Sequence, residues 1–261
     1  MTGRIDTARD GVVVTVSIDH ADKLNALTVA MWRELARVMR ELSADDALRC
    51  IVLRGAGDKA FAAGADIAEF ATVRSTREQG IVYHREHVFG ALQAVAECRH
   101  PVVAMIHGPA VGGGLEIACQ CDLRIAGESG RFGVPINRLG FSIAYDELAA
   151  VLPVVGRAAA LEMLIEGRVW DAHEAFAKGL LTRVVADAQL AAETHATVER
   201  ICAGAPLVAR WHKQFIRRLT PQAEPLTPQE IDDSFAYFET EDFRAGYDAF
   251  IQKKKPRFTG R

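Results

Sequence analysis

The most informative stretch of this sequence is HGPAVGGGLE, residues 107–116. It follows a strand-like segment, residues 102–106, and leads into a helix-like segment, residues 116–121. Consecutive glycines at such a junction let the backbone approach a ligand closely. The first amides of a helix have no partner within it and carry partial positive charge, so they can hold an oxyanion. Glu116 falls in the first helical turn, and a carboxylate beside such amides suits proton chemistry next to a carbonyl.

The same stretch also fits a purely structural role. A tight turn needs small residues, and the helix dipole favours an acidic residue such as Glu116 near a helix start. Nucleotide binding is disfavoured, because the stretch lacks the Lys-Ser/Thr ending of a phosphate loop and the Gly-x-Gly-x-x-Gly spacing of a dinucleotide site. The glycine run alone therefore leaves the choice between a site and a turn open.

A second block favours a site. The segment DKAFAAGADI, residues 58–67, follows another strand-like run, residues 50–54. Together the two blocks resemble the enoyl-CoA hydratase/isomerase (crotonase) superfamily. The resemblance continues in family order through KLNAL (23–27), CDLRIA (121–126), RFGVP (131–135), EAFAKGL (174–180) and FIQKKKPRF (250–258). These blocks span nearly the whole chain and are specific for the superfamily, but much less specific for the reaction.

Composition excludes several other classes of protein. The chain has 261 residues, 49% of them hydrophobic, which is enough for one large core. Its net charge of -3 gives no reason to expect nucleic acid or an anionic membrane as partner. No apolar run approaches the roughly 20 residues that a membrane-spanning helix needs. Cys119 and Cys121 have no matching ligand pair, so we expect them to pack rather than bind metal. Five cysteines and no apolar signal segment at the start lead us to expect a cytoplasmic protein.

Residue patterns predict an α/β fold. Residues 11–18, 50–54, 102–106 and 123–126 are rich in β-branched or apolar residues and are expected to form strands. Residues 28–42 carry apolar residues at helical spacing, with Thr28 as N-cap, and a polar helix is expected from about Arg77 to Cys98. Helices covering parallel strands explain this alternation. The resemblance sharpens the expectation to a crotonase-like spiral of β-β-α turns.

The last third of the chain is expected to be helical. Helical patterns cover residues 158–165, 172–178, 188–201, 207–219 and 228–238. In the superfamily such a region makes trimer contacts, so the resemblance implies a homotrimer or a dimer of trimers. We therefore expect a spiral core for acyl-CoA binding and catalysis at residues 1–200, and a helical oligomerisation region at residues 201–261. The alternative is a helical cap on the chain's own core.

The resemblance implies an acyl-CoA thioester as ligand, with coenzyme A as part of the substrate and neither a metal nor a separate cofactor. It also implies a thioester enolate held by two backbone amides, which match those of Ala65 and Gly113. Glu116 matches one of the two catalytic glutamates of the hydratases. A carboxylate in that role needs a pKa raised towards neutrality, which partial burial would supply.

The second hydratase glutamate is absent. It follows the proline of the block RFGVP in the hydratases, and here that position is Ile136, which can neither activate water nor transfer a proton. The nearby loop offers Tyr145 as a proton donor to an enolate and Asp146 as a base. The alternative is that Asp146 or Glu147 caps the next helix and that Tyr145 packs.

Positions that bind the rest of the ligand also follow from the resemblance. Lys23 is placed near the CoA phosphates, whereas Phe250 and Lys253 match a pair that reaches a neighbouring subunit's CoA. The positions expected to contact substrate or CoA are Lys23, Ala63, Asp66, Ile67, Gly112, Ile136, Phe250 and Lys253. The helix that shapes the acyl pocket in relatives carries Arg77, Tyr83, His84 and His87, any of which could contact a polar acyl group.

The sequence thus predicts an acyl-CoA enzyme, with enoyl-CoA hydratase as the first interpretation. Enoyl-CoA isomerisation is the runner-up, because a single carboxylate such as Glu116 can move one proton between carbons. Decarboxylation of an acyl-CoA and thioester hydrolysis use the same oxyanion hole. A non-enzymatic alternative is an inactive acyl-CoA-binding subunit that kept the fold and lost the chemistry.

Overall fold

The computed structural model describes residues 2–220 and 225–260 and is built on a six-stranded sheet. In spatial order its strands are β1 (Arg4–Asp10), β2 (Val13–Asp19), β3 (Cys50–Gly55), β4 (Val102–Ile106), β6 (Leu123–Gly127) and β9 (Arg183–Val185). Within this six-stranded sheet β1 and β2 pair antiparallel, and every later neighbour pair is parallel. Parallel strands bring their carboxyl ends to one edge of the sheet, so loops distant in sequence meet there.

A smaller sheet takes up the second strand of each β-β-α turn in the expected spiral. It consists of β5 (Pro109–Val111), β7 (Arg131–Gly133) and β8 (Val169–Asp171). In β4–β5–α5 (α5, Gly113–Gln120) and β6–β7–α6 (α6, Tyr145–Leu161), the first strand joins the large sheet and the second joins the small one. The expected β-β-α turns of an α/β fold are therefore confirmed.

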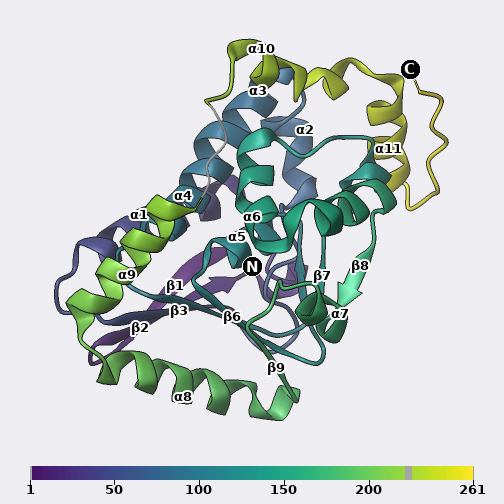
Figure 1. Ribbon diagram of the computed structural model, residues 1–261. Helices are drawn as coiled ribbons and strands as arrows, with labels where there is room; N and C mark the ends of the chain where they lie inside the picture. The colour runs from purple at the N-terminus through teal and green to yellow at the C-terminus, as the bar shows by residue number, and fades with distance from the viewer. Residues whose placement is uncertain (1, 221–224, 261) are drawn as a thin grey trace.

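Both faces of the large sheet are covered, as Figure 1 shows. Alternate residues of a strand point to opposite faces. In β3, Ile51 and Leu53 pack into the main core with α1 (Val29–Ala44), α4 (Phe89–Glu97) and α5, whereas Cys50 and Val52 pack towards α8 (Leu190–Ala203). This two-sided burial fits the apolar run of the parallel strands. Because both faces of the sheet are buried, functional groups are expected in the loops at the strand ends.

The polar helix expected at residues 77–98 is present but not uniform. It consists of α3 (Arg77–Val82), a π-helical turn η3 (Tyr83–Val88) and α4. Thr76 caps its start by accepting a hydrogen bond from the backbone N–H of Gln79. A π turn inserts extra residues into a helix and changes which side chains face inwards, and such turns are frequent at functional sites.

Helix α6 continues as a π turn, η5 (Glu162–Glu166), and corrects one expectation from the sequence. The segment Tyr145–Glu166 has 22 residues and contains an 18-residue window with a mean hydropathy of 1.8, so by length and composition it could cross a membrane. The expectation that no apolar run approaches this length is therefore wrong. Gly156, with φ 75°, breaks the helix inside this segment, because its backbone is not helical. The absence of a membrane partner stays a prediction.

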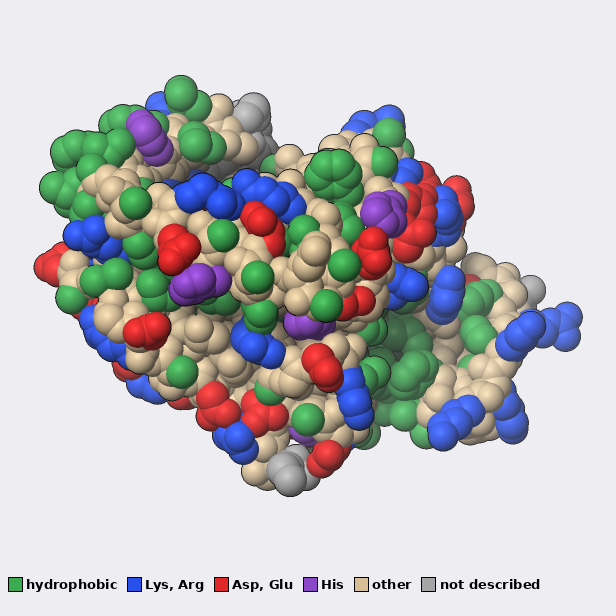
Figure 2. Space-filling view, turned by 90° about the horizontal axis from the view of Figure 1, so that it is seen from below, with side chains coloured by type: hydrophobic (Ala, Val, Ile, Leu, Met, Phe, Trp, Pro, Cys, Tyr) green, Lys and Arg blue, Asp and Glu red, His purple; other side chains and the backbone are tan. Residues whose placement is uncertain are grey.

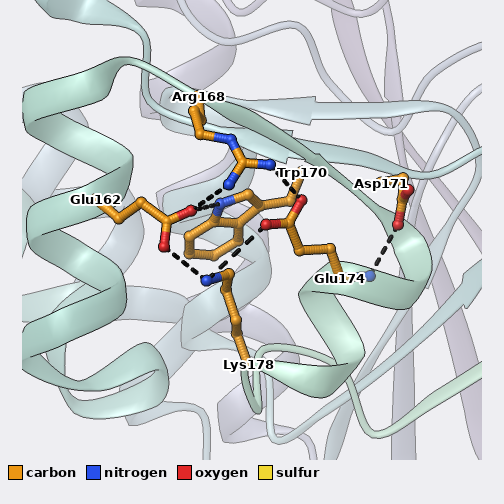
Figure 3. A network of polar contacts seen from close by, with 6 residues as sticks. All are labelled: Glu162, Arg168, Trp170, Asp171, Glu174 and Lys178. Carbon is orange, nitrogen blue, oxygen red and sulfur yellow. Dashed lines mark hydrogen bonds and ion pairs between the residues drawn. The ribbon is translucent and has the colours of Figure 1, made fainter.

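A network of polar contacts fixes the end of this segment, as Figure 3 shows. Glu162 receives hydrogen bonds from Arg168 at 2.6 Å and from Lys178 at 2.7 Å. Arg168 also binds Glu174 at 2.9 Å, on α7 (Ala172–Ala177). The buried Trp170 of β8 donates its indole N–H to Glu162 at 3.2 Å. The network joins the end of α6 to the small sheet and so holds α6 in place.

The helical C-terminal region has two parts. Helix α9 (Pro206–Leu219) is anchored through Lys213, which pairs with Asp122 at 2.8 Å, yet none of its residues is fully buried. Figure 2 shows apolar side chains gathered at the end of the molecule where α9 lies. Helices α10 (Pro228–Asp233) and α11 (Glu241–Ile251), joined by the short turn η7 (Ala236–Glu239), lie at the opposite end, near α3 (Figure 1). The expected boundary between residues 200 and 201 falls inside α8, and trimer formation stays a prediction.

Candidate active site

A cavity of about 370 Å³ opens beside the glycine run. Its lining is mostly apolar or aromatic, with a few polar side chains among them, which is the usual character of a small-molecule site. The lining includes Trp32, Ala63, Gly64, Ala65, Ile67, Phe70, Arg74, Tyr83, His84, Gly112, Gly113, Glu116, Ile136, Arg138, Phe141, Glu147 and Phe250. These residues come from α1, η3, α5, α6 and α11 and from the segments that follow β3, β5 and β7.

Two loops meet backbone to backbone at one wall of the cavity. Gly64 has φ +94°, and a Cβ added there would lie 2.9 Å from the Val111 carbonyl oxygen and 3.5 Å from the Gly113 nitrogen. A hydrogen bond of 2.7 Å from the N–H of Leu27 to the Gly64 carbonyl fixes this loop. Within residues 2–220 and 225–260, the N–H groups of Ala65 and Gly113 donate no hydrogen bond. Both amides are therefore available to a ligand in the cavity.

Glu116 lies just beyond these amides, at the start of α5. Its side chain lines the cavity and the residue is only 4% exposed. Burial raises its pKa well above the ordinary value of 4.5, and the nearby carboxyl of Glu147 raises it further, while the Arg74 guanidinium opposes the shift. A carboxyl group with a raised pKa can hold a proton at neutral pH and give it to a substrate.

Glu147 brings a second carboxyl group into the same cavity. It occupies the first turn of α6, is 5% exposed and hydrogen-bonds Nδ1 of His84. The π turn η3 directs both His84 and Tyr83 to the cavity, and the Tyr83 hydroxyl accepts a hydrogen bond of 3.2 Å from the Trp32 indole. Burial lowers the pKa of His84, which favours its neutral form, in which Nδ1–H donates to the Glu147 carboxylate. The histidine therefore orients that carboxylate.

This arrangement corrects the expectation for the loop before α6. Tyr145 is 42% exposed and Asp146 pairs with Arg85 at 3.4 Å, and neither of them lines the cavity. Both had been candidates to replace the missing glutamate, whereas Glu147 had been expected only to cap the helix. Helical phase separates them, because Glu147 shares the buried face of α6 with Ala150. That spacing could have identified Glu147 from the sequence.

Arg74 is a functional candidate that no sequence pattern indicated. It follows α2 (Phe70–Val73), is 3% exposed and lines the cavity. Its guanidinium carbon lies 4.6 Å from the ring centre of Phe70 and 4.4 Å from that of Phe141. Its Nη2 donates a hydrogen bond of 2.7 Å to the Tyr237 hydroxyl, from a turn 163 residues away in sequence. The long separation explains why local patterns did not reveal it.

The other predicted contact positions divide into two groups. Those that line the cavity are Ala63, Ile67, Gly112, Ile136 and Phe250. Lys23 and Asp66 instead pair with each other at 2.6 Å outside the lining, and Lys253 lies beyond the end of α11. Phe250 lines the cavity of its own chain, and the expectation that it reaches a neighbouring subunit's CoA stays a prediction.

Of the helix residues expected to shape an acyl pocket, Tyr83 and His84 do line the cavity. Arg77 instead forms ion pairs with Asp232 and Glu239 at 2.8 and 2.7 Å. The remaining candidate, His87, contacts Arg33 outside this cavity.

Comparison with known proteins finds relatives of this chain in both sequence and structure. A family model described as enoyl-CoA hydratase/isomerase matches residues 8–261. A protein of Rhizobium meliloti named as a probable enoyl-CoA hydratase is 34% identical over 257 residues, covering 96% of each chain. A solved enoyl-CoA hydratase/carnithine racemase from Magnetospirillum magneticum is 49% identical, with a TM-score of 0.82 over 98% of this chain and 96% of that one. A methylmalonyl-CoA decarboxylase solved with 2-nitronate-propionyl-CoA is 25% identical, with a TM-score of 0.87 over 98% of each chain.

Proposed function

Because the chain belongs to the enoyl-CoA hydratase/isomerase family, we propose that its cavity binds an enoyl-CoA thioester and adds water across the conjugated double bond. The observation that carries this proposal is the presence of two buried carboxyl groups, Glu116 and Glu147, in one cavity beside two unused backbone amides. Hydration needs one group to take a proton from water and another to protonate the adjacent carbon.

The thioester carbonyl is proposed to lie against the N–H groups of Ala65 and Gly113. Charge develops on this oxygen when water attacks Cβ and an enolate forms. Two fixed donors in a cavity shielded from water stabilise such an oxyanion without reorganising. The first amides of α5 also lie at the positive end of the helix dipole, which adds to the same effect.

The two carboxyl groups then have complementary tasks. The Glu147 carboxylate accepts a proton from water while the water oxygen bonds to Cβ, and Glu116 in its protonated form delivers a proton to Cα. The product gains one water molecule in total. Afterwards Glu147 holds a proton and Glu116 has lost one, so proton exchange with solvent restores the starting state. His84 keeps the Glu147 carboxylate oriented throughout.

This assignment removes the difficulty raised by Ile136. That side chain lines the cavity and supplies only an apolar surface. The second carboxylate comes instead from α6, which approaches the cavity from another side. Coenzyme A enters as part of the substrate, and the proposal requires no other cofactor.

Double-bond migration is the second candidate, and Ile136 is the observation that favours it. With an apolar residue at the position of the family's second glutamate, Glu116 alone would carry a proton from one carbon of the acyl chain to another. Such a reaction changes neither the mass nor the number of atoms of the thioester.

The deciding measurement is the loss of the conjugated absorbance of crotonyl-CoA, followed by mass analysis of the product. Hydration predicts a product heavier by one water molecule and no turnover by Glu116→Gln. Absence of turnover on crotonyl-CoA and on longer enoyl thioesters would refute hydration. An unchanged mass with a moved double bond would identify the isomerase, and tight CoA binding without turnover of any thioester would identify an inactive binding subunit.

A further inference from the structure

Arg74 is a buried cation that the proposed hydration does not use. It lines the cavity, is 3% exposed and forms no ion pair with a carboxylate anywhere in residues 2–220 and 225–260. Its Nε is buried without a hydrogen-bond partner among these residues, and its side chain makes a single hydrogen bond there, to the neutral hydroxyl of Tyr237. Most of the donor capacity of this guanidinium is therefore unused.

An unpaired charge inside a protein is costly, and buried arginines are normally matched with an anion. The aromatic faces of Phe70 and Phe141 compensate part of this cost, because a guanidinium is attracted to the face of a ring. They also hold the planar group in one orientation. Arg138, which lines the same cavity, is different, because it donates to the Gly167 carbonyl at 2.7 Å. Of these two arginines, Arg74 is the one with a buried donor atom, Nε, that has no hydrogen-bond partner among the described residues.

We propose that Arg74 binds a carboxylate at the far end of the acyl group, so that the substrates are CoA thioesters of dicarboxylic acids. The guanidinium presents several N–H donors in a planar fork that matches a carboxylate. The location at the far end rests on the proposed function, which places the thioester carbonyl at the amides of Ala65 and Gly113. The described ring and hydrogen-bond contacts of Arg74 lie among Phe70, Tyr83, Phe141, Tyr237 and Phe238 instead.

Other charges in the cavity permit such a substrate. Glu147 is engaged by His84, and burial keeps the carboxyl group of Glu116 in its protonated form over a wider pH range. The substrate carboxylate therefore meets the Arg74 cation and one glutamate carboxylate, that of Glu147, rather than two. Phe70 and Phe141 would exclude water around this ion pair and so strengthen it.

Two thioesters of equal main-chain length test the proposal: glutaconyl-CoA, which ends in a carboxylate, and trans-2-pentenoyl-CoA, which ends in a methyl group. We expect the wild-type protein to favour the acid in kcat/KM by about tenfold or more. Arg74→Met should lower kcat/KM for the acid about 100-fold relative to kcat/KM for the neutral substrate, the usual loss when one partner of a buried charged pair is removed. Arg74→Lys should retain part of the preference, because it keeps the charge without the fork.

Arg85→Met is the matched control. Arg85 lies on η3 and pairs with Asp146 outside the cavity lining, so its removal deletes a nearby positive charge without touching the site. The preference for the acid should survive this change. If Arg85→Met abolished the preference as Arg74→Met does, a general electrostatic attraction would replace the specific contact.

Binding of the saturated pair glutaryl-CoA and valeryl-CoA, measured by calorimetry, separates this proposal from hydration. Tighter binding of glutaryl-CoA that depends on Arg74, without turnover of either enoyl thioester, would refute hydration and support the carboxylate site. Turnover without any preference for the acid would support hydration and overturn the carboxylate site. Equal losses on both substrates in Arg74→Met and Arg74→Lys would also overturn it, since they indicate a structural role.

Discussion

Replacing Glu147 by glutamine tests the central element of the proposed chemistry. Glutamine has nearly the shape of glutamate and its carbonyl oxygen can still accept the hydrogen bond from His84, so the cavity should keep its form. The substitution removes the carboxylate that is proposed to accept a proton from water. The expected consequence is a loss of hydration rate with little loss of substrate binding.

The size of the loss follows from the role of the group. A positioned general base contributes about 10²- to 10⁴-fold in rate. With about 1.4 kcal/mol for each factor of ten, this corresponds to about 2.8–5.6 kcal/mol of activation free energy. Because Glu147 is buried and its carboxylate is oriented by His84, we expect a loss of about 10³-fold in kcat. KM should change much less, since water activation matters only in the transition state.

The pH profile provides a second, independent readout. Glu116 acts in its protonated form, so activity falls as the pH rises through its raised pKa. The charge of Glu147 is one cause of that raised pKa. In Glu147→Gln this contribution is gone, the pKa of Glu116 decreases, and the residual activity should begin to fall at a lower pH than in the wild-type protein.

The assay is the initial rate of absorbance loss of a conjugated enoyl-CoA, measured across pH. Asp146→Asn is the matched control, because Asp146 neighbours Glu147 on α6 but pairs with Arg85 outside the cavity. Thermal unfolding of both variants verifies that they are folded. A Glu147→Gln rate within about threefold of wild type, or an equal loss in Asp146→Asn, would refute the assignment of Glu147 as base, since a general base is worth far more.

Three further predictions concern the backbone, stability and assembly. Gly113→Pro removes the N–H proposed to bind the oxyanion, whereas Gly113→Ala keeps it. Both add a Cβ only 2.7 Å from the Trp32 ring, so both require the same small shift there. The kcat values should differ by about 10²- to 10³-fold between the two variants, and equal rates would contradict the role of this amide. Because burial raises the folded-state pKa of Glu116 above 4.5, the free energy of unfolding should fall as the pH rises from about 4.5 to that pKa, by about 1.4 kcal/mol for each pKa unit. Urea unfolding of Glu116→Gln should show a flatter dependence on pH above about 4.5, and an unchanged dependence would argue against this shift. The exposed Trp211 and Phe215 of α9, 49% and 55% exposed, lie four residues apart on one apolar face, so we expect a trimer or a dimer of trimers in solution, measured by light scattering. Replacing both by glutamate should give monomers, and a wild-type monomer would contradict the assembly.

Local patterns in the sequence were sufficient for most of the fold. Apolar and β-branched runs located the strands around residues 50–54 and 102–106, and helical spacing located α1 with its Thr28 cap. These features depend on neighbours close in sequence, which is why they can be predicted. The π turn at Tyr83–Val88 was missed, because packing rather than local preference determines it.

For the candidate site, the sequence determined the glycine loops, Ala65, Gly113 and Glu116, because these belong to contiguous blocks of the chain. Only the tertiary structure revealed that Glu147, which we propose as the replacement for the missing glutamate, lines the same cavity. Glu147 meets His84 across 63 residues, and Arg74 meets Tyr237 across 163. Such pairs form when α6, η3 and the C-terminal turn pack around one cavity, and burial then sets the pKa of Glu116. Helical spacing within α6 indicates that Glu147 faces inwards, but the side chains that meet it and its desolvation are properties of that packing, which local sequence patterns do not contain.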